Sequence, residues 1–287
     1  MIVVRLYGGL GNQLFQYSTG RRLAEYVGEE LVLDIGNLGH NVSNITTRQY
    51  ELWRYPICAR TLSSNEVKFA KLYTNKLLKR LPLPRPWLFQ KEKYFQFNPD
   101  ILESSGSVYL DGYWQSPKYF ESIKKTLRTE LTPIEPMGVS DQITAKIISE
   151  TNSVAIHVRR GDYVSVKSVA QTHGICSLDY YHSAIELMNK HVRTPTFFVF
   201  SDDPDWVQEN LKTNLPIEYV NHNGSNNAFQ DVRLISLCQH QVIANSSFSW
   251  WGAWLNPNPK KLVVAPKKWF LDVRDTSDMC PKNWIRL

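Results

Sequence analysis

Apolar runs of β-forming residues alternate along the chain with longer segments of mixed polarity. Residues 2–7 form the first such run. Gly8, Gly9 and Gly11 follow it, and residues 12–27 then place apolar side chains near one helical stripe. Residues 31–34 form a second short apolar run. This order of strand, glycine turn, helix and strand predicts a βαβ unit near the N-terminus.

A second alternating series begins near residue 153. It predicts strands at 154–158, 196–200, 217–220, 241–244 and 262–265, and helices at 178–190, 205–211, 228–238 and 247–255. Ser177 is the expected N-cap of the helix at 178–190. Strands that alternate with helices indicate a mostly parallel sheet with helices on both faces.

The chain between these two series is harder to interpret. Residues 36–115 are mixed, aromatic and rich in proline, and we expect helices and loops there that complete the first lobe. Pro133 and Pro136 interrupt the chain between the series. The sequence therefore predicts two α/β lobes, residues 1–140 and residues 141–287, and a length of 287 residues suits two domains of ordinary size.

Composition and charge narrow the class of protein. An aromatic fraction of 12% supplies enough core material to argue against a disordered chain. The net charge of +6 suits an anionic ligand, an anionic membrane face or nucleic acid, without choosing among them. The basic stretch at residues 68–85 is interpreted first as a solvated helix and second as a contact with a membrane surface or polyanion. The four cysteines form no C-x-x-C pair, which argues against a zinc site. No apolar run approaches the ~20 residues of a spanning helix, so we expect a cytoplasmic protein.

The glycine turn is a candidate ligand loop. Glycines between a strand and a helix permit positive φ and let backbone N–H groups approach an anion at the positive end of the helix. The run Gly8-Gly9-Leu10-Gly11-Asn12-Gln13 fits neither the P-loop spacing nor G-x-G-x-x-G. A tight structural turn is an equally good interpretation of this run alone.

Polar residues also follow the first predicted strand of the second series. His157 and Arg159 are two residues apart and share one face of a strand, at the end where open α/β sheets bind ligands. An arginine there can hold a diphosphate with its bidentate fork. Asp162 could orient Arg160 or Tyr163, or act as a base. An ordinary Arg–Asp ion pair is the alternative interpretation.

Acidic residues on later elements have similar double interpretations. Asp202 lies close to the expected site, whereas Asp203 more simply caps the next helix. Asp231 could accept the paired N–H donors of guanine. Alternatively, it neighbours Arg233 on a solvated helix face.

The segment after the strand at 241–244 begins another helix. Ser246 and Ser247 could donate to a phosphate or to a ring, or could only cap that helix. The tryptophans of this helix have the spacing of core residues: Trp250, Trp251 and Trp254.

Taken together, four runs in this order resemble the bacterial alpha-1,2-fucosyltransferases, glycosyltransferase family 11. The runs span residues 8–17, 157–163, 200–203 and 244–252, and the resemblance is weakest over residues 36–115. It implies a GT-B architecture, two facing Rossmann-like lobes with the active site in the cleft between them. It also implies inverting transfer of L-fucose from GDP-fucose to the 2-hydroxyl of a terminal galactose. The first lobe would be the acceptor side and the second would bind GDP-fucose.

The resemblance further implies roles for single residues. In the wider group of fucosyltransferases the first arginine of an H-x-R-R motif holds the β-phosphate, which falls here on Arg159. The aspartate on the helix before the last motif holds guanine, which falls here on Asp231. The catalytic candidates are Arg159, Asp162 and His173, and the base stays open between Asp162 and His173. The other expected GDP-fucose-binding residues are Gly9, Gly11, Asn12, Gln13, His157, Asp202, Ser246, Ser247 and Phe248.

The resemblance implies no cofactor and no essential metal, so a fixed arginine and helix-end amides must stabilise the departing GDP. Asp202 and Asp203 are adjacent, which is the wrong spacing for a D-x-D metal motif. The expected partners are GDP-fucose and a galactose-terminated glycan, with no nucleic acid, and the basic stretch could hold the enzyme at the inner membrane face. Three alternatives stay open: a fucosyltransferase of another linkage, a transferase of another GDP-sugar, and a non-catalytic protein that binds a nucleotide sugar.

Overall fold

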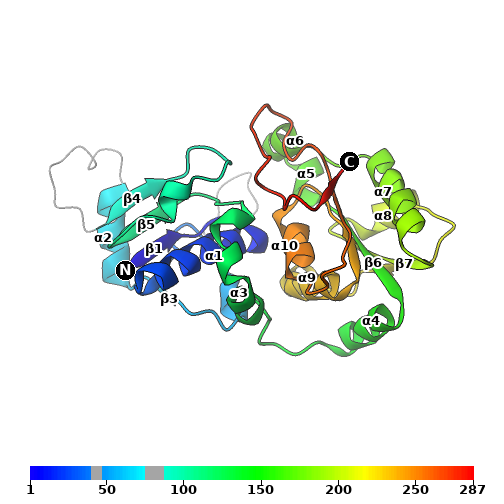
Figure 1. The fold of residues 1–287 in the computed structure, drawn as a ribbon, viewed down its shortest axis with the longest axis horizontal. Helices are drawn as coiled ribbons and strands as arrows, with labels where there is room; N and C mark the ends of the chain where they lie inside the picture. The colour runs from blue at the N-terminus through cyan, green and yellow to red at the C-terminus, as the bar shows by residue number, and fades with distance from the viewer. Residues whose placement is uncertain (40–46, 75–86) are drawn as a thin grey trace. The chain divides into compact units, whose positions relative to one another are not determined.

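The computed structural model describes residues 1–39, 47–74 and 87–287 (Figure 1). The chain divides into two compact units, and each unit contains one sheet. Unit 1 comprises Met1–Thr132 and Ser277–Met279, and unit 2 comprises Pro133–Thr276 and Cys280–Leu287. Pro133, one of the two prolines noted in the sequence, is thus the first residue of unit 2.

The sheet of unit 1 has the strand order β3-β2-β1-β5-β4, and every neighbouring pair is parallel. Its strands are β1 (Ile2–Arg5), β2 (Leu31–Asp34), β3 (Arg60–Thr61), β4 (Leu88–Lys91) and β5 (Val108–Asp111). The α-helices are α1 (Leu10–Val27), α2 (Ser64–Thr74) and α3 (Lys124–Glu130), and short 3₁₀ helices lie at Leu52–Arg54, Pro99–Ile101, Pro117–Tyr119 and Glu121–Ile123.

Three of these strands fall within residues 36–115, so the expectation of only helices and loops there was incomplete. β3 has two residues, and β4 is a partly exposed edge strand. Neither shows the fully apolar run by which β1 and β2 were predicted. β5 is buried but only four residues long. Its length and burial pattern equal those of β2, so its short apolar run was overlooked within a segment of mixed polarity.

The sheet of unit 2 has the order β11-β10-β9-β6-β7-β8, again with every pair parallel. Its strands are β6 (Asn152–Val158), β7 (Pro195–Ser201), β8 (Ile217–Val220), β9 (His240–Val242), β10 (Val263–Ala265) and β11 (Ile285–Arg286). The α-helices are α4 (Val139–Glu150), α5 (Gly161–Ser165), α6 (Lys167–His173), α7 (Leu178–His191), α8 (Pro204–Asn210), α9 (Ala228–Leu237) and α10 (Ser247–Leu255), and a 3₁₀ helix lies at Ser225–Asn227. Numbered within this unit, the order is the doubly wound 3-2-1-4-5-6 of the Rossmann fold.

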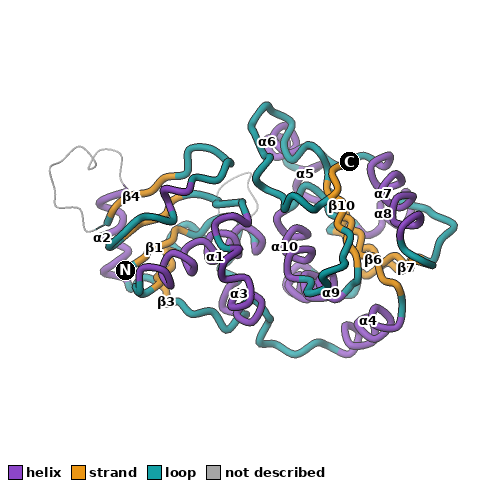
Figure 2. Tube along the Cα trace, viewed as in Figure 1, coloured by secondary structure: helices purple, strands orange, loops and turns teal. Residues whose placement is uncertain are grey.

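Helices cover both faces of the second sheet (Figure 2). Val154, Ile156 and Val158 of β6 pack with α7 and α8, because alternate strand residues point to the same face. Ala155, between them, packs on the other face with Ile148 of α4 and with α9. The tryptophans of α10 are buried, as predicted: Trp250, Trp251 and Trp254.

The elements of the second series were the best predicted. β8 and α10 have the predicted bounds, and the other predicted strands and helices of unit 2 differ by one or two residues at either end. Four elements of this unit were not predicted: α4, α5, α6 and β11. In unit 1, β2 also has the predicted bounds. Ser177 caps α7, since its side chain accepts a hydrogen bond from the Tyr180 N–H at 3.2 Å. Within the described residues, no helix combines the length and apolar character needed to cross a membrane.

Candidate active site

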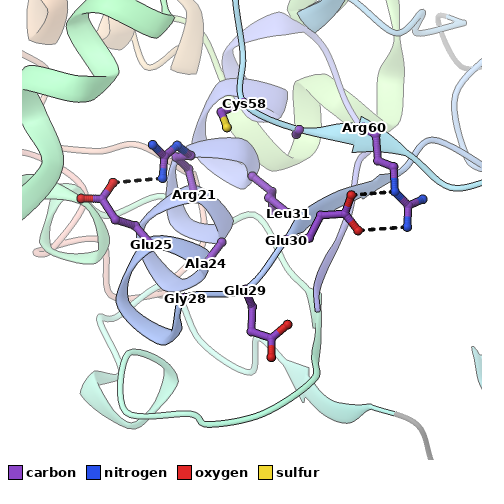
Figure 3. A pocket seen from close by; sticks show the side chains of 10 residues that line it. Arg21, Ala24, Glu25, Gly28, Glu29, Glu30, Leu31, Cys58 and Arg60 are labelled. Carbon is purple, nitrogen blue, oxygen red and sulfur yellow. Dashed lines mark hydrogen bonds and ion pairs between the residues drawn. The ribbon is translucent and has the colours of Figure 1, made fainter.

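The cavity drawn in Figure 3 lies in unit 1, beside the C-terminal end of α1 and the start of β2. Its volume is about 390 Å³, and ion pairs line it: Arg21 with Glu25 at 2.9 Å and Arg60 with Glu30 at 2.9 Å. This is the end of the sheet at which the parallel strands begin. Open α/β sheets bind ligands where the strands end. No predicted site residue lines this cavity, and those residues lie instead at the end where the strands finish.

In unit 2 the order of strands reverses between β6 and β9, and a doubly wound fold binds its ligand at this point. The loops that leave these two strands are joined, because the Tyr163 hydroxyl donates to the Asn245 carbonyl at 3.1 Å. Asn245 also donates through Nδ2 to the carbonyls of His173, at 2.9 Å, and Trp269, at 3.2 Å. One buried amide therefore ties three loops around the end of the sheet.

Arg159 is the first residue after β6, and two carboxylates fix its guanidinium. Nη2 donates to Asp162 Oδ1 at 2.5 Å, and Nη1 lies 2.9 Å from Asp202 Oδ2. Burial opposes the charge of Arg159, but Asp202 and Asp162 outweigh burial and raise its pKa. The arginine is thus a cation in a set orientation. Asp162 therefore orients Arg159. The sequence had suggested Arg160 or Tyr163 as the residue that Asp162 orients.

Asp202 braces this loop through both of its oxygens. Its Oδ1 accepts the Arg160 backbone N–H at 2.8 Å, while Oδ2 pairs with Arg159. A Cβ on Gly161 would lie 2.2 Å from Asp202 Oδ2, so only glycine leaves room for the carboxylate. The expectation that Asp203 caps the next helix was wrong. The Asp203 side chain makes no cap bond because Arg160 binds it at 3.0 Å.

His157 lies at the end of β6 with 4% of its surface exposed. Its ring is 5.3 Å from that of Phe248 on α10. Burial and the nearby Arg159 charge lower the pKa of His157 to about 3, so the imidazole is neutral at physiological pH. The buried Nδ1 has no hydrogen-bond partner among the described residues. His157 and Phe248, which are far apart in sequence, are thus neighbours.

His173 ends α6 and lies between two aromatic rings. Tyr163 stacks on it at 4.8 Å, and the Phe270 ring lies 5.0 Å away. Arg159 lies over the Tyr163 ring at 5.3 Å. Burial, together with Arg274, lowers the pKa of His173. The structure therefore brings the predicted catalytic residues Arg159, Asp162 and His173 together around Tyr163.

The N-terminus of α10 follows β9, next to these groups. Ser246 is the N-cap, but its side chain makes no cap bond, so the interpretation of this serine as a simple helix cap was wrong. The first helical hydrogen bond runs from the Trp250 N–H to the Ser246 carbonyl at 3.0 Å. The N–H groups of Ser247 and Phe248 precede it and have no partner within the helix. This end of α10 presents donors and the positive end of a helix dipole.

Asp231 lies in the first turn of α9 and is half-buried. Burial raises its pKa to about 7. Its Oδ1 accepts a hydrogen bond from Asn223 Nδ2 at 2.9 Å. The alternative of an Asp231–Arg233 neighbour pair is not what the structure has, since Arg233 donates to the Glu135 carbonyl at 3.1 Å.

The glycine turn occupies the corresponding place in unit 1, after β1. Gly8 has φ +80°, and a Cβ there would lie 2.4 Å from Asn12 Nδ2. Gly9 is the N-cap of α1, and Gly11 lies in its first turn. Asn12 Oδ1 accepts from Gln115 Nε2 at 2.7 Å, which ties the turn to the loop after β5.

Gln13 is completely buried behind this turn. Its Nε2 donates to the carbonyls of Gly8 at 3.0 Å and Gln49 at 2.7 Å, and its Oε1 accepts the Glu51 N–H at 3.0 Å. These bonds use both amide hydrogens. Gln13 therefore shapes the loop from behind, whereas Gly9, Gly11 and Asn12 form the turn itself.

Sequence reasoning missed a polar and aromatic cluster at the same edge of the first sheet. The Tyr7 and Tyr113 rings, after β1 and β5, meet edge-on at 4.7 Å. Glu92, after β4, accepts the N–H groups of Tyr113 at 2.6 Å and Trp114 at 2.9 Å. Burial raises the pKa of Glu92 to about 7. The cluster was missed because β4 and β5, which end beside it, were not predicted.

The model of the glycosyl transferase family 11 matches residues 63–287. The chain belongs to glycosyltransferase family 11. The match contains all the predicted site residues of unit 2, and the chain is therefore a glycosyltransferase.

Two relatives of known activity are similar in sequence to this family 11 chain. It is 33% identical over 296 residues to an alpha-1,2-colitosyltransferase of Escherichia coli, covering 100% of this chain and 99% of that protein. It is 27% identical over 202 residues to a galactoside 2-alpha-L-fucosyltransferase of Caenorhabditis elegans, covering 65% and 52%.

The structural comparison concerns the fold alone. A mutant of Arabidopsis thaliana FUT1 in complex with GDP matches with a TM-score of 0.51 at 12% identity, covering 91% of this chain and 69% of that one. Together with the two parallel sheets, this match confirms the predicted GT-B fold class.

Proposed function

We propose that this family 11 enzyme transfers L-fucose from GDP-fucose, with inversion, to the 2-hydroxyl of a terminal galactose. One observation carries the donor half of the proposal: Arg159, braced by Asp162 and Asp202 at the point where the strand order reverses. The name of the Caenorhabditis elegans relative supports the sugar and the galactoside acceptor, and the names of both relatives support the 1,2 linkage.

On the donor side, Arg159 would hold the β-phosphate and stabilise the charge that develops as GDP leaves. The N–H groups at the start of α10, with Ser246 and Ser247, would bind the same diphosphate. These fixed donors would act without a metal ion. Removal of one such donor costs ~10²–10³ in rate. Asp202 would act through Arg159 and not by direct contact.

The nucleoside would be held by neighbouring side chains. His157 and Phe248, whose rings lie 5.3 Å apart, would pack against the nucleoside of the donor, and Asp231 would accept the N1 and N2 hydrogens of guanine. For the first two the support is their position, since both flank the switch point. For Asp231 it is the family resemblance together with the burial of its carboxylate.

On the acceptor side, residues 1–140 would bind the galactoside. Tyr7 and Tyr113 offer the ring faces on which sugars stack, and Glu92 and Asp111 offer acceptors for sugar hydroxyls. Gly9, Gly11 and Asn12 would line the approach to the donor, and Gln13 would keep that turn in shape.

Asp162 and His173 stay the candidates for the base. Asp162 is engaged by Arg159, whereas the lowered pKa of His173 keeps its ring neutral and able to accept a proton. A transition state with strong oxocarbenium character needs only a weak base. Comparison of Asp162→Asn with His173→Asn at saturating acceptor would separate the two roles.

A second candidate is transfer of colitose, because the full-length relative at 33% identity is a colitosyltransferase. Colitose is L-fucose without its 3-hydroxyl. A site that hydrogen-bonds that hydroxyl would reject the deoxy sugar strongly, and an apolar site would not. The ratio of kcat/KM for the two GDP-sugars therefore decides between the candidates.

The test of the proposal is GDP release from GDP-fucose, GDP-colitose and GDP-mannose with β-galactoside acceptors and EDTA. We expect turnover with GDP-fucose that survives EDTA and falls ~10²–10³-fold in Arg159→Ala. Tight GDP binding without turnover on any acceptor would favour a non-catalytic nucleotide-sugar-binding protein. Preference for another GDP-sugar would refute the donor assignment.

We also propose that the enzyme acts at the cytoplasmic face of a membrane. Lys68 and Lys71 are exposed on α2, and the rest of the basic stretch, Lys76, Lys79, Arg80 and Arg85, lies outside the described residues. Anionic vesicles should bind the enzyme, and replacement of these basic residues by glutamine should abolish that binding. Unchanged vesicle binding would refute the contact.

A further inference from the structure

Four polar side chains form a network in unit 2 between α4, α9 and the loop after β8. Asn223 is its centre. The Asn223 Nδ2 donates to Asp141 Oδ1 at 2.8 Å and to Asp231 Oδ1 at 2.9 Å. On the other side, His222 Nε2 lies 2.9 Å from Asp141 Oδ1. Asp141 is 4% exposed, so this network is anchored in the interior.

The bridge defines how the Asp231 carboxylate points. An amide nitrogen carries two hydrogens, and here each goes to a different carboxylate. A flipped amide would aim its oxygen at both acids, which fixes the orientation of Asn223. Asp231 Oδ1 is thereby held, whereas its Oδ2 has no hydrogen-bond partner among residues 1–39, 47–74 and 87–287.

The helices that carry the two acids are themselves fastened to one segment. Gln230 Nε2 donates to the Pro136 carbonyl at 3.1 Å, and Arg233 Nη1 donates to the Glu135 carbonyl at 3.1 Å. The same segment leads directly into α4, which carries Asp141 in its first turn. Asp231 is therefore set by contacts on both sides of its helix, and Asn223 makes the only one of these that reaches the carboxylate itself among the described residues.

We propose that Asn223, anchored by Asp141, is a positioning residue that aims the Asp231 carboxylate at the N1–H and N2–H edge of guanine and so sets base specificity. This inference rests on the proposed function, in which Asp231 holds guanine. Two parallel N–H donors need two oxygens in a set plane. A carboxylate that can rotate loses this match, while a contact to a single donor survives rotation.

The network also gives guanine recognition a pH dependence. The ionisable groups that face Asp231 are His222 and Asp141. Burial raises the pKa of Asp231 to about 7, the Asn223 hydrogen bond and His222 lower it, and Asp141 raises it. Only the ionised carboxylate accepts both guanine donors, so recognition weakens as pH falls below about 7. Loss of Asn223 should move this midpoint to higher pH, and loss of the Asp141 charge should move it lower.

The experiment measures the dissociation constants of GDP and inosine diphosphate by calorimetry between pH 5.5 and 8.5. Inosine diphosphate lacks only the N2 amino group, and the ratio of the two constants cancels the titration of the shared diphosphate. The variants are Asn223→Ala, Asp141→Asn and Asp231→Asn, with Asn214→Ala, an exposed asparagine of the same unit, as the matched control.

The wild type and the control should prefer GDP by about tenfold or more at pH 8, because one charge-assisted hydrogen bond is lost with inosine. Asn223→Ala should lower the ratio at pH 8 several-fold and move the midpoint up. Asp141→Asn, which keeps the shape of the side chain, should move it down. A wild-type ratio and midpoint in Asn223→Ala, with the ratio lost in Asp231→Asn, would overturn the inference alone. An unchanged ratio in Asp231→Asn would instead remove the guanine role of Asp231 from the proposed function.

Discussion

Replacement of Gly161 by alanine adds a single methyl group next to the brace of Arg159. Gly161 follows Arg160 at the start of α5, and its added Cβ would lie 2.2 Å from Asp202 Oδ2. This oxygen is the one that pairs with Arg159 Nη1 at 2.9 Å. Ordinary contact requires about 3.4 Å or more, so the carboxylate must move by over 1 Å. Gly161→Ala therefore breaks the brace of Arg159 without removing any charged group.

The expected result is a fall in kcat of about 10²-fold, because a misplacement of 1 Å in a group that positions the reaction has that cost. The chain should still fold, with the free energy of unfolding lowered by about 1–3 kcal/mol, because the displaced carboxylate loses its contacts with the Arg160 N–H and with Arg159. The assay is the initial rate of GDP release at saturating GDP-fucose and acceptor, with thermal unfolding recorded for the same samples.

Gly224→Ala is the matched control. Gly224 lies in the same unit, and an added Cβ there meets nothing within 4 Å. This variant should keep the wild-type rate. If Gly161→Ala also keeps the wild-type rate while folded, the bracing of Arg159 by Asp202 does not matter for turnover, and the reasoning is refuted.

Three other predictions concern the remaining contacts. Asp162→Asn should lower kcat by about tenfold or more, because it removes one charge-assisted partner of Arg159. The rate of GDP release and the affinity for GDP are the two measurements. An unchanged rate would contradict this role of Asp162. Burial raises the pKa of Glu92 to about 7, above the ~4.3 of a free glutamate, so its ionisation should destabilise the fold as pH rises from about 4.5 to 7. Glu92→Gln should flatten this decline, and urea unfolding at pH 5 and 8 measures it. Gly252→Ala should cost about 1–3 kcal/mol, since its Cβ would lie 2.4 Å from Ile235 Cγ2 where α9 packs on α10. If Gly252→Ala unfolds at the same urea concentration as the wild type, α9 and α10 can move apart at little cost and the prediction is wrong.

Local pattern predicted the second unit well and the first unit poorly. β6 and β7 are buried on both faces and therefore have long apolar runs, which the sequence shows directly. β3 and β4 are short edge strands whose residues are half-exposed, so their place in the sheet depends on pairing partners distant in sequence. The hydrophobic periodicity of a segment does not show which distant strand it pairs with.

The candidate site, too, could be predicted only in part from the sequence. Arg159 and His157 could be found because strand ends are where α/β sheets bind ligands. The role of Asp202 as a brace could not, because residues 159 and 202 follow different strands and only the parallel pairing of β6 with β7 brings them together. The same holds for Asn223, which meets Asp141 across 82 positions of sequence. Simple capping failed for Asp203 because local sequence cannot show that Arg160 competes for its carboxylate. Ser246 lies at the N-cap position of α10, but its side chain makes no cap bond.

The donor, the linkage and the inversion are tested together by the NMR structure of the product formed from GDP-β-L-fucose and a β-galactoside. We expect one product, with an α-fucosyl residue attached to O2 of the terminal galactose. A fucosyl residue on another hydroxyl, or a β-linked product, would contradict this expectation.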